Sequence, residues 1–473
     1  MLIKEINGEF CATEILKLFS GLPYPFALES SLVDPERGRF SIIGFDPFGV
    51  HRQKANGSLD QLKQKFSRYK YENNHLALPF YAGIVGYLAY DHGLYQEKIK
   101  QRSIDDLKLP DCLFGFYDSA IVLDHLEKKL FITSSGLPVR DGALCRQRAQ
   151  KRMDMILGRL KLLEPLRYDL SPSSEKTGGA LLSNFSGLQY RQAVKKALEY
   201  INDGDIYQVN LSHRFCFYNE KATDAVLLYK LLGLRSPSSF SAYFDAGLFK
   251  IISSSPERFL HVKGDIVHTC PMKGTRPRGH TPQDDLRFRR QILESEKEKA
   301  ELLMIIDLER NDLGRVCRYG SVNVRDMRSI ETYSTVFQAT STVEGKLCDG
   351  KDAFDLIAAA FPGGSITGCP KIRSMQIIEE LEPTRRGIYT GSLGYIDFCG
   401  NMDLNILIRT LLVNDDTIYF QVGSGIVADS TPEEEYEETL VKARAMKEAL
   451  LDIVAGSTHR SWPPEGAMAS HSF

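Results

Sequence analysis

Hydrophobic and polar residues alternate over short segments in the first third of the chain, a pattern typical of β-strands. Residues 80–91 are rich in β-forming residues and interrupted by glycines, which predicts a strand that a neighbour approaches closely. Residues 119–123 and 130–133 flank a polar turn and predict a hairpin. The basic segment 140–161 has helical spacing instead, and we interpret it as a solvated helix.

Beyond residue 186, helical and strand patterns succeed one another. Ser186 can cap a helix whose apolar residues Tyr190, Val194 and Leu198 share one face, and Gly204 ends it. The apolar patterns predict strands at 206–212, 240–244, 251–255, 388–398, 404–413 and 417–422. Further helices are predicted at 285–310, 353–360, 371–381 and from 432 to about 453.

A polar segment rich in Ser and Gly at residues 166–185 is the strongest candidate for a boundary. With 473 residues, the chain is longer than one ordinary hydrophobic core requires. The sequence therefore predicts a β-rich N-terminal domain (1–165), a linker (166–185), a second domain (186–455) and a flexible tail (456–473).

Composition and charge exclude several classes of function. The net charge of −2 gives no bulk electrostatic reason to bind nucleic acid or an acidic membrane surface. The nine cysteines form no CxxC pair, so neither a zinc site nor a disulfide framework is indicated. The sequence has no apolar run of about 18 residues and no signal-like N-terminus. We expect a cytoplasmic protein that binds neither nucleic acid nor a membrane.

Two pairs of glutamates share helical spacing. Glu298 and Glu301 lie three residues apart on one predicted helix, and Glu435 and Glu438 repeat the spacing on the last helix. If the helices face each other, four carboxylates repel unless a cation lies between them, and oxygen ligands suit Mg²⁺. The alternative is that both pairs lie on solvated helix faces, and spacing alone favours that alternative.

Three further features are candidates for binding chemistry. Lys273 lies in a segment (270–279) broken by Pro and Gly, so it can point from a turn into a cleft or belong to a basic surface loop. The glycines of segment 421–427 can bring backbone N–H groups to an anion or serve only packing. Arg409 lies within an apolar strand pattern, and a buried arginine needs a carboxylate or ligand as its partner.

These features occur together in one family, the chorismate-utilising enzymes, which include anthranilate, aminodeoxychorismate and isochorismate synthases. The chain resembles this family over nearly its whole length, most densely at 186–455. The matching segments are PMKGTRPRG (271–279), KEKAELLMIIDLERNDLGRV (297–316), FPGGSITGCPK (361–371), YTGSLGY (389–395) and GSGIVADSTPEEEYEETLVKA (423–443). The resemblance implies an α+β fold in which two large, mostly antiparallel sheets pack as a sandwich with helices outside.

The resemblance also implies roles for the candidate residues. Glu301 and Glu438 would hold Mg²⁺, with Glu298 and Glu435 beside them. Residues implied to bind chorismate, mainly through its carboxylates, are Asn210, Thr275, Gln338, Tyr389, Arg409, Gly423, Gly425 and Lys442. A dianionic substrate calls for such a set of cation, guanidinium and oriented N–H groups.

Two positions separate the members of the family. Isochorismate and salicylate formers carry a lysine base where this chain has Gln208, and anthranilate synthases usually have Ala where it has Lys273. By resemblance, the chain is of the aminodeoxychorismate synthase component I type. Lys273 would add to C2 of chorismate with loss of the C4 hydroxyl, ammonia would then enter at C4, and Glu257 would act as general acid and base.

Gln338 stands where many relatives have His, and an amide cannot transfer a proton at neutral pH. A lysine must lose its proton to attack, which nearby positive charge from the metal and from Arg276 or Arg278 would favour.

The resemblance implies a partner, because the chain has no segment like the cysteine elbow of a glutamine amidotransferase. A separate amidotransferase subunit would supply ammonia for 4-amino-4-deoxychorismate, the entry to p-aminobenzoate and folate. Segments 28–31 and 236–244 resemble a tryptophan pocket in relatives, which makes Ser30, Ser31 and Pro237 candidates for such a pocket. The alternatives are anthranilate synthase component I and a non-catalytic subunit that binds an aromatic precursor.

Overall fold

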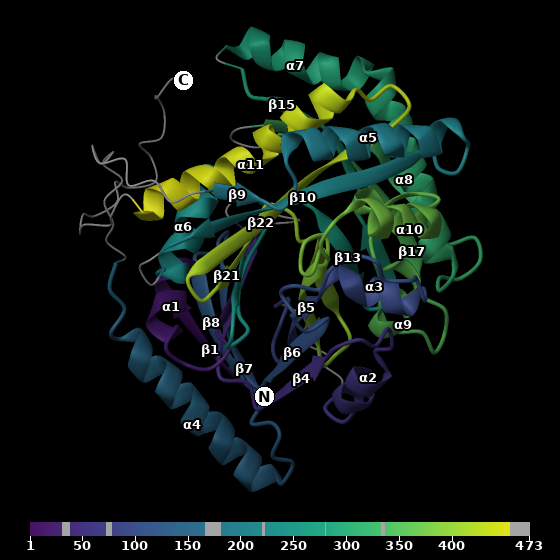
Figure 1. Cartoon of the computed structure of the whole chain (residues 1–473). Coiled ribbons are helices and arrows are strands. Elements are labelled where there is room, and N and C mark those ends of the chain that lie inside the picture. Colours follow the sequence, from purple (N-terminus) through teal and green to yellow (C-terminus); the bar gives the residue numbers. More distant parts are fainter. Residues whose placement is uncertain are drawn as a thin grey trace.

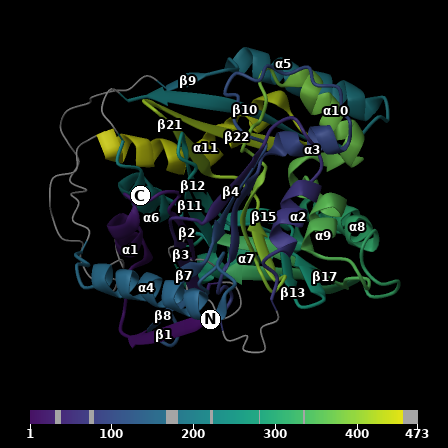
Figure 2. The same cartoon turned by 90° about the horizontal axis from the view of Figure 1, so that it is seen from below.

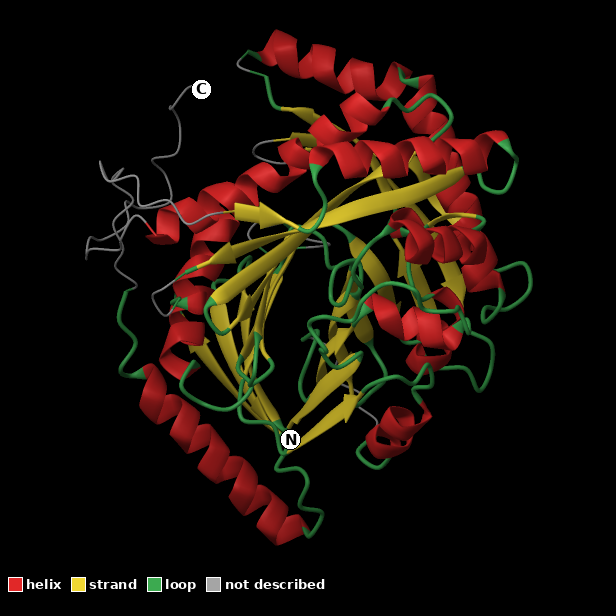
Figure 3. Cartoon of the chain, viewed as in Figure 1, coloured by secondary structure: helices red, strands yellow, loops and turns green. Residues whose placement is uncertain are grey.

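Two large β-sheets form the centre of the molecule, and helices cover their outer faces (Figures 1 and 3). The computed structural model describes residues 1–30, 38–71, 78–165, 181–219, 223–279, 281–332 and 336–454, without the side chains of Thr275, Pro277 and Val336. All strand pairs within the two sheets are antiparallel (Figure 2 gives a second view). The predicted fold class is confirmed.

The first sheet has twelve strands among the described residues. In spatial order they are β1 (Leu2–Asn7), β8 (Lys129–Ser134), β7 (Ser119–Asp124), β3 (Phe40–Gly44), β2 (Phe26–Glu29), β11 (Phe240–Asp245), β12 (Lys250–Ser255), β21 (Thr410–Asn414), β22 (Thr417–Ile426), β10 (Gln208–Tyr218) and β18 (Gly368–Cys369), with β9 (Leu181–Ser183) also pairing with β10.

The second sheet has ten described strands. Their order is β15 (Met272–Pro277), β17 (Val336–Lys346), β14 (Ile266–Thr269), β13 (Arg258–Lys263), β20 (Met402–Asn405), β19 (Ser392–Asp397), β5 (Gly83–Leu88), β6 (Cys112–Tyr117) and β4 (Gly49–Gln53), with β16 (Asn323–Thr332) also pairing with β17.

The helices divide between the two outer faces. The described helices are α1 (Ala12–Phe19), α2 (Asp60–Ser67), α3 (Tyr90–Gln96), α4 (Gly142–Leu160), α5 (Gly187–Asn202), α6 (Ala225–Arg235), α7 (Pro282–Glu294), α8 (Glu296–Gly314), α9 (Ala353–Ala360), α10 (Lys371–Leu381), α11 (Pro432–Val454) and a 3₁₀ turn, η1 (Gly364–Ile366). One apolar cluster joins α1, α4, α6 and α11 to the first sheet, and a second joins α2, α8, α9 and α10 to the other sheet.

A third apolar cluster lies between the sheets, and the alternation along β11 shows how the strands supply it. Ala242 and Phe244 belong to the cluster between the sheets, whereas Tyr243 belongs to the cluster under the helices. Successive side chains of a strand point to opposite faces, so one strand can fill two cores. The sandwich therefore has a buried interior on both sides of each sheet.

Side-chain caps begin several of the described helices. Ser186 and Gln189 form a capping box at the start of α5, as the predicted cap requires. The predicted helix over 285–310 is wrong in one respect, because two helices occupy this segment. Ser295 is extended and its side chain accepts a hydrogen bond from the backbone N–H of Glu298, so it begins a new helix and ends α7.

The strand predicted over 404–413 is also two strands. Arg409 has a left-handed backbone (φ 49°) and lies between β20 and β21, in the segment where the chain passes from the second sheet to the first. Apolar residues continue through this crossing because both strands are buried, which is why the pattern reads as one strand.

The expected boundary at residues 166–185 does not separate the sheets. β2 from the N-terminal part pairs with β11, and β5 pairs with β19, so each sheet takes strands from both sides of the boundary. Residues 166–180 and the predicted tail at 456–473 lie outside the described residues. None of the helices in the described segments combines the length and apolar character needed to cross a bilayer.

Candidate active site

Lys273 lies on β15, an edge strand of the second sheet and not the turn that its Pro and Gly neighbours suggest. The register with β17 shifts between Lys273 and Thr275, and Gly274 between them has a left-handed backbone (φ +79°). A Cβ on Gly274 would lie 2.5 Å from a carboxylate oxygen of Glu298. The glycine therefore permits both the bulge and the close packing of α8 against β15.

Groups from several elements lie around the Lys273 ammonium. Its Nζ lies 3.1 Å from Oε2 of Glu301 on α8 and 3.5 Å from the place that a Cβ on Gly425 of β22 would occupy. Its positive charge also acts on the carboxyl groups of Glu257 and Glu438. The fold thus brings the predicted nucleophile, the predicted acid and two of the predicted metal ligands to one place.

Glu257 is a buried carboxyl group whose pKa is shifted towards neutral pH. Burial raises its pKa to about 7, against the hydrogen bond from Ser365 and the positive charge of Lys273. Oγ of Ser365 donates to Oε1 of Glu257 at 2.6 Å. A carboxyl group whose pKa lies near neutrality can both donate and accept a proton, which is what general acid and base catalysis needs.

Another buried carboxyl group near Glu257 was not predicted. Glu309 of α8 accepts a hydrogen bond from Thr269 at 3.1 Å, and burial, followed by the negative charge of Glu257, raises its pKa well above the ordinary value. Both Ser365 and Glu309 lie in segments that match the family, so the resemblance covers them without giving them a role.

The four predicted metal-binding glutamates each have a partner in the structure. Glu301 pairs with Lys273, Glu298 with Arg276 at 2.8 Å, Glu438 with Lys442 at 2.7 Å, and Glu435 accepts a hydrogen bond from Ser430 at 2.6 Å. Within the described segments, no group of three or more His, Cys, Asp or Glu side chains is arranged to hold a metal ion. The magnesium site stays a prediction.

The charges that act on Glu438 nevertheless indicate that α8 and α11 lie close to each other. Burial would raise the pKa of Glu438 on α11, but the ion pair with Lys442 and the charges of Lys273 and Lys297 lower it. Lys297 lies on α8, so the charged faces of α8 and α11 are close. One carboxylate from each helix, Glu301 and Glu438, therefore lies near the same ammonium group.

The neighbouring strands β10 and β22 contribute polar groups beside the lysine. Asn210 pairs in register with Gly425, and a Cβ on Gly423 would lie 2.8 Å from Oδ1 of Asn210. Nζ of Lys442 donates to the carbonyl oxygen of Gly423 at 2.9 Å. The two glycines are therefore needed for close approach, with Gln208 Nε2 only 2.9 Å from a Cβ on Gly425.

A buried ion pair that no sequence pattern indicated holds this region together. Arg386 and Glu382 are 1% and 3% exposed and lie 2.7 Å apart. Arg386 also donates to the backbone oxygen of Asn210 at 2.7 Å, and its guanidinium group lies 5.7 Å from the ring centre of Tyr389. Burial raises the pKa of Tyr389, so the phenol is neutral.

Gln338, Thr275 and Arg409 are predicted to bind the substrate, and their surroundings in the structure differ. Gln338 is buried on β17 and pairs in register with Thr275, whose side chain lies outside the described set. Arg409 is only partly buried, and its Nη1 donates to Oγ of Ser236 at 3.4 Å. The prediction of a buried strand arginine is therefore wrong, because the chain turns between sheets at this residue.

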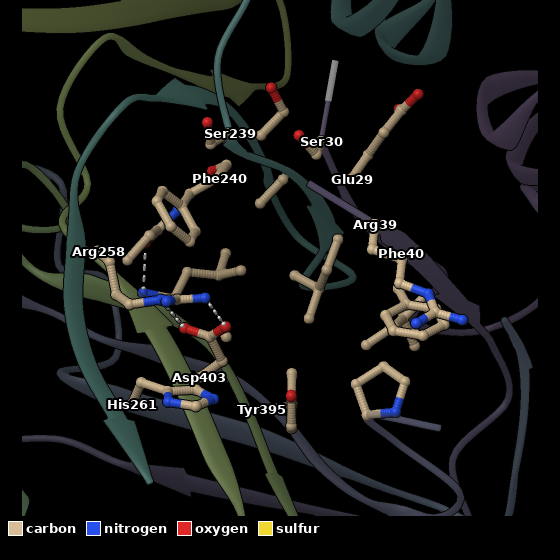
Figure 4. Close-up of a pocket in the computed structure, with 18 of the residues that line it drawn as sticks. Glu29, Ser30, Arg39, Phe40, Ser239, Phe240, Arg258, His261, Tyr395 and Asp403 are labelled. Carbon is tan, nitrogen blue, oxygen red and sulfur yellow. Dashed lines mark hydrogen bonds and ion pairs between the residues drawn. The ribbon is translucent and has the colours of Figure 1, made fainter. Parts of the chain in front are cut away.

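A separate cavity of about 620 Å³ lies between the sheets (Figure 4). Strands β2, β3 and β11 line one side, and β13, β19 and β20 the other. Ser30 is on its wall, as are Ser239 and Phe240 from the predicted segment 236–244. Pro237 is not on the described wall, and Ser31 lies outside the described residues. On the cavity wall, the guanidinium group of Arg258 lies over the Phe240 ring and pairs with Asp403 at 2.9 Å.

The antiparallel double sheet thus brings together a lysine, a buried carboxyl group and two glutamates carried by helices. Residues 29–448 match the model of the chorismate binding enzyme family, and the chain belongs to that family. The predicted resemblance is confirmed at this level.

Individual relatives fall into two groups. The chain is 39% identical over 431 residues to aminodeoxychorismate synthase component 1 of Bacillus subtilis, covering 87% of this chain and 89% of that protein. It is 41% identical over 460 residues to anthranilate synthase component 1 of Thermus thermophilus, covering 94% and 96%. The crystal structure of anthranilate synthase component I from Streptococcus pneumoniae is similar with a TM-score of 0.76 and 32% identity, covering 88% of this chain and 93% of that one.

Proposed function

We propose that the chain is aminodeoxychorismate synthase component I, which aminates chorismate to 4-amino-4-deoxychorismate for p-aminobenzoate and folate synthesis. The observation that carries the proposal is the position of Lys273, 3.1 Å from Glu301 and electrostatically coupled to Glu257. The similarity to a Bacillus subtilis protein of that name over 89% of its length supports it.

The residues suggest a two-step substitution. Nζ of Lys273, after leaving its ion pair with Glu301 and losing a proton, bonds to C2 of chorismate. Both ring double bonds shift, from C1–C2 and C5–C6 to C1–C6 and C4–C5, and the C4–O bond breaks, while Glu257 donates its proton so that the hydroxyl group leaves as water. Ammonia then bonds to C4, both double bonds shift back, the C2–Nζ bond breaks, and the excess proton of the new amine returns to Glu257.

Mg²⁺ is the cation proposed for this site, with few carboxylates as its ligands. Glu301 and Glu438 would hold it, with Glu298 and Glu435 beside them. Mg²⁺ usually takes one or two protein carboxylates and leaves its other positions to water and substrate oxygens. When bound, the ion would supply positive charge for a substrate carboxylate.

Ammonia would come from a separate glutamine amidotransferase subunit. The relatives at 39% and 41% identity both carry the designation component 1, which supports a partner of this kind.

The cavity between the sheets would hold tryptophan, as proposed from Ser30 and its neighbours, in a regulatory or structural role.

Anthranilate formation is the second candidate, supported by the Thermus thermophilus relative and the Streptococcus pneumoniae structure. The third is a subunit that binds an aromatic precursor without reaction. The test incubates the chain with chorismate, an ammonium salt and Mg²⁺, and identifies products by mass spectrometry. 4-Amino-4-deoxychorismate supports the proposal, anthranilate supports the second candidate, and unchanged chorismate supports the third.

Lys273→Ala makes the test specific. We expect loss of aminodeoxychorismate formation by at least about a hundredfold, the range of a lost nucleophile or proton-transfer group. Lys299→Ala, an exposed lysine on α8, is the matched control and should keep full activity. Without ammonia, intact-protein mass spectrometry should find an adduct on the wild type that is missing in Lys273→Ala. Unchanged turnover in Lys273→Ala contradicts the mechanism.

A further inference from the structure

Two histidines on neighbouring strands meet at the wall of the cavity between the sheets. His261 of β13 pairs in register with His268 of β14, and His261 lines the cavity. Their Nδ1 atoms are 3.4 Å apart, and the ring planes differ by only 11°. Neither residue belongs to the site around Lys273.

The ring geometry shows that the two nitrogens face each other. The ring centres are 5.7 Å apart, and the two Nδ1 atoms are 3.4 Å apart. The difference almost equals the distance from ring centre to ring atom, counted once for each imidazole. Both nitrogens must therefore lie near the line that joins the ring centres, with the rings edge to edge in nearly one plane.

This arrangement fits a shared proton and not a shared metal ion. A metal midway between the nitrogens would be half of 3.4 Å from each, or about 1.7 Å, whereas a Zn–N bond needs about 2.0–2.1 Å. Two bare nitrogens would repel each other, and two N–H groups would collide. One proton between Nδ1 of His261 and Nδ1 of His268 satisfies both rings.

Glu344 fixes the other end of His268. Nε2 of His268 lies 2.9 Å from Oε2 of Glu344 on β17, so this nitrogen carries a proton that it donates to the carboxylate. When His268 is neutral, its Nδ1 must accept the shared proton from His261, whose Nε2 is then a hydrogen-bond acceptor. When His268 is charged, its Nδ1 donates to Nδ1 of His261, and the His261 ring carries its proton on Nε2, which becomes a donor.

The surrounding charges favour placing the positive charge on His268. Burial, with Arg258, His268 and Lys263 acting in the same direction and Asp403 against it, lowers the pKa of His261 to about 4. Asp403 is engaged by Arg258, at 3.0 and 2.9 Å. The carboxylate of Glu344 faces His268 instead. A positive charge is therefore less favourable on the His261 ring than beside the carboxylate of Glu344.

We propose that His261, His268 and Glu344 form a proton relay that reverses the hydrogen-bonding character of the cavity wall. In the uncharged state, Nε2 of His261 accepts a hydrogen bond, which suits a ligand with an N–H or ammonium group. In the charged state, it donates one, which suits a carboxylate or other acceptor. One proton taken up at Nε2 of His261 and one moved from Nδ1 of His261 to Nδ1 of His268 complete the switch.

The experiment follows the protonated nitrogen of each ring as the pH changes. Magic-angle-spinning ¹⁵N–¹³C spectra of the full chain labelled at histidine distinguish Nδ1–H, Nε2–H and doubly protonated rings. Signals are assigned with His261→Gln and His268→Gln. Between pH 8 and pH 5, His268 should become doubly protonated while His261 changes from Nδ1–H to Nε2–H, at one common midpoint.

Two variants test the roles of the partners. Glu344→Gln removes the charge that stabilises the His268 cation, so the common midpoint should fall by about one pH unit. His268→Gln leaves His261 without a titrating partner, so His261 should keep a single tautomer from pH 8 to pH 5. His213, a buried ring hydrogen-bonded to Thr439, is the internal control and should be unaffected by either substitution.

Two results would overturn the relay. One is a His261 ring that keeps the same protonated nitrogen while His268 becomes doubly protonated in the wild type. The other is a pair that titrates at two separate pH values. Because neither measurement uses chorismate, both are independent of the reaction proposed for Lys273.

Discussion

Replacing Glu257 by Gln should make the protein more stable at alkaline pH while it removes the proposed acid. Burial holds the pKa of Glu257 at about 7, compared with an ordinary value of 4.5. The folded state thus binds this proton more tightly than the unfolded state does. The stabilisation is complete below the ordinary pKa and is lost as the pH rises through 7.

The size of the effect follows from the shift. A difference between 4.5 and about 7 costs the wild type about 3 kcal/mol at pH 8, at 1.36 kcal/mol for each pKa unit. Gln has nearly the same shape, is neutral throughout, and can still accept the hydrogen bond from Ser365. Glu257→Gln should therefore exceed the wild type in free energy of unfolding by up to this amount at pH 8, and by much less at pH 5.

Urea unfolding followed by far-UV circular dichroism at pH 5 and pH 8 measures the difference. Glu164→Gln, an exposed carboxylate after α4, is the matched control and should show no pH-dependent gain. Chorismate turnover by Glu257→Gln should fall about a hundredfold or more, since general acid catalysis contributes that much. If the stability difference between Glu257→Gln and the wild type is the same at both pH values, burial does not hold this carboxyl group protonated.

Three further predictions test the buried ion pair, the glycine strand and the metal of the proposed site. Arg386→Leu should destabilise the chain by about 3–5 kcal/mol, because Glu382 is left buried without its partner, and Arg386→Leu with Glu382→Leu should recover part of the loss in thermal unfolding. Gly425→Ala places a methyl group 2.9 Å from Gln208, so kcat/KM for chorismate should fall at least about tenfold with a small change in Tm; an unaltered kcat/KM argues against substrate at this strand. Removing divalent ions with EDTA should abolish turnover, Mg²⁺ should restore it, and turnover that survives EDTA contradicts the magnesium assignment.

Several elements could be predicted because their signals are local. The capping box at Ser186, the turn between β7 and β8 and the acidic start of α11 depend on residues within a few positions of one another. The break at Ser295 was missed because the residues on both sides favour a helix, and only the cap geometry divides them. Arg409 was misplaced because apolar residues continue through the crossing between sheets.

The sequence by itself determined the family, the helices that carry the glutamates and the identity of the candidate nucleophile, since these depend on residue order and on short-range periodicity. The tertiary structure alone decided which charges meet. Lys273, Glu301, Glu257 and Gly425 are far apart in sequence and come together only because β15, α8, the start of β13 and β22 converge at one end of the sandwich. The proton-holding state of Glu257 likewise depends on burial, a property of the packed molecule that residue order does not display.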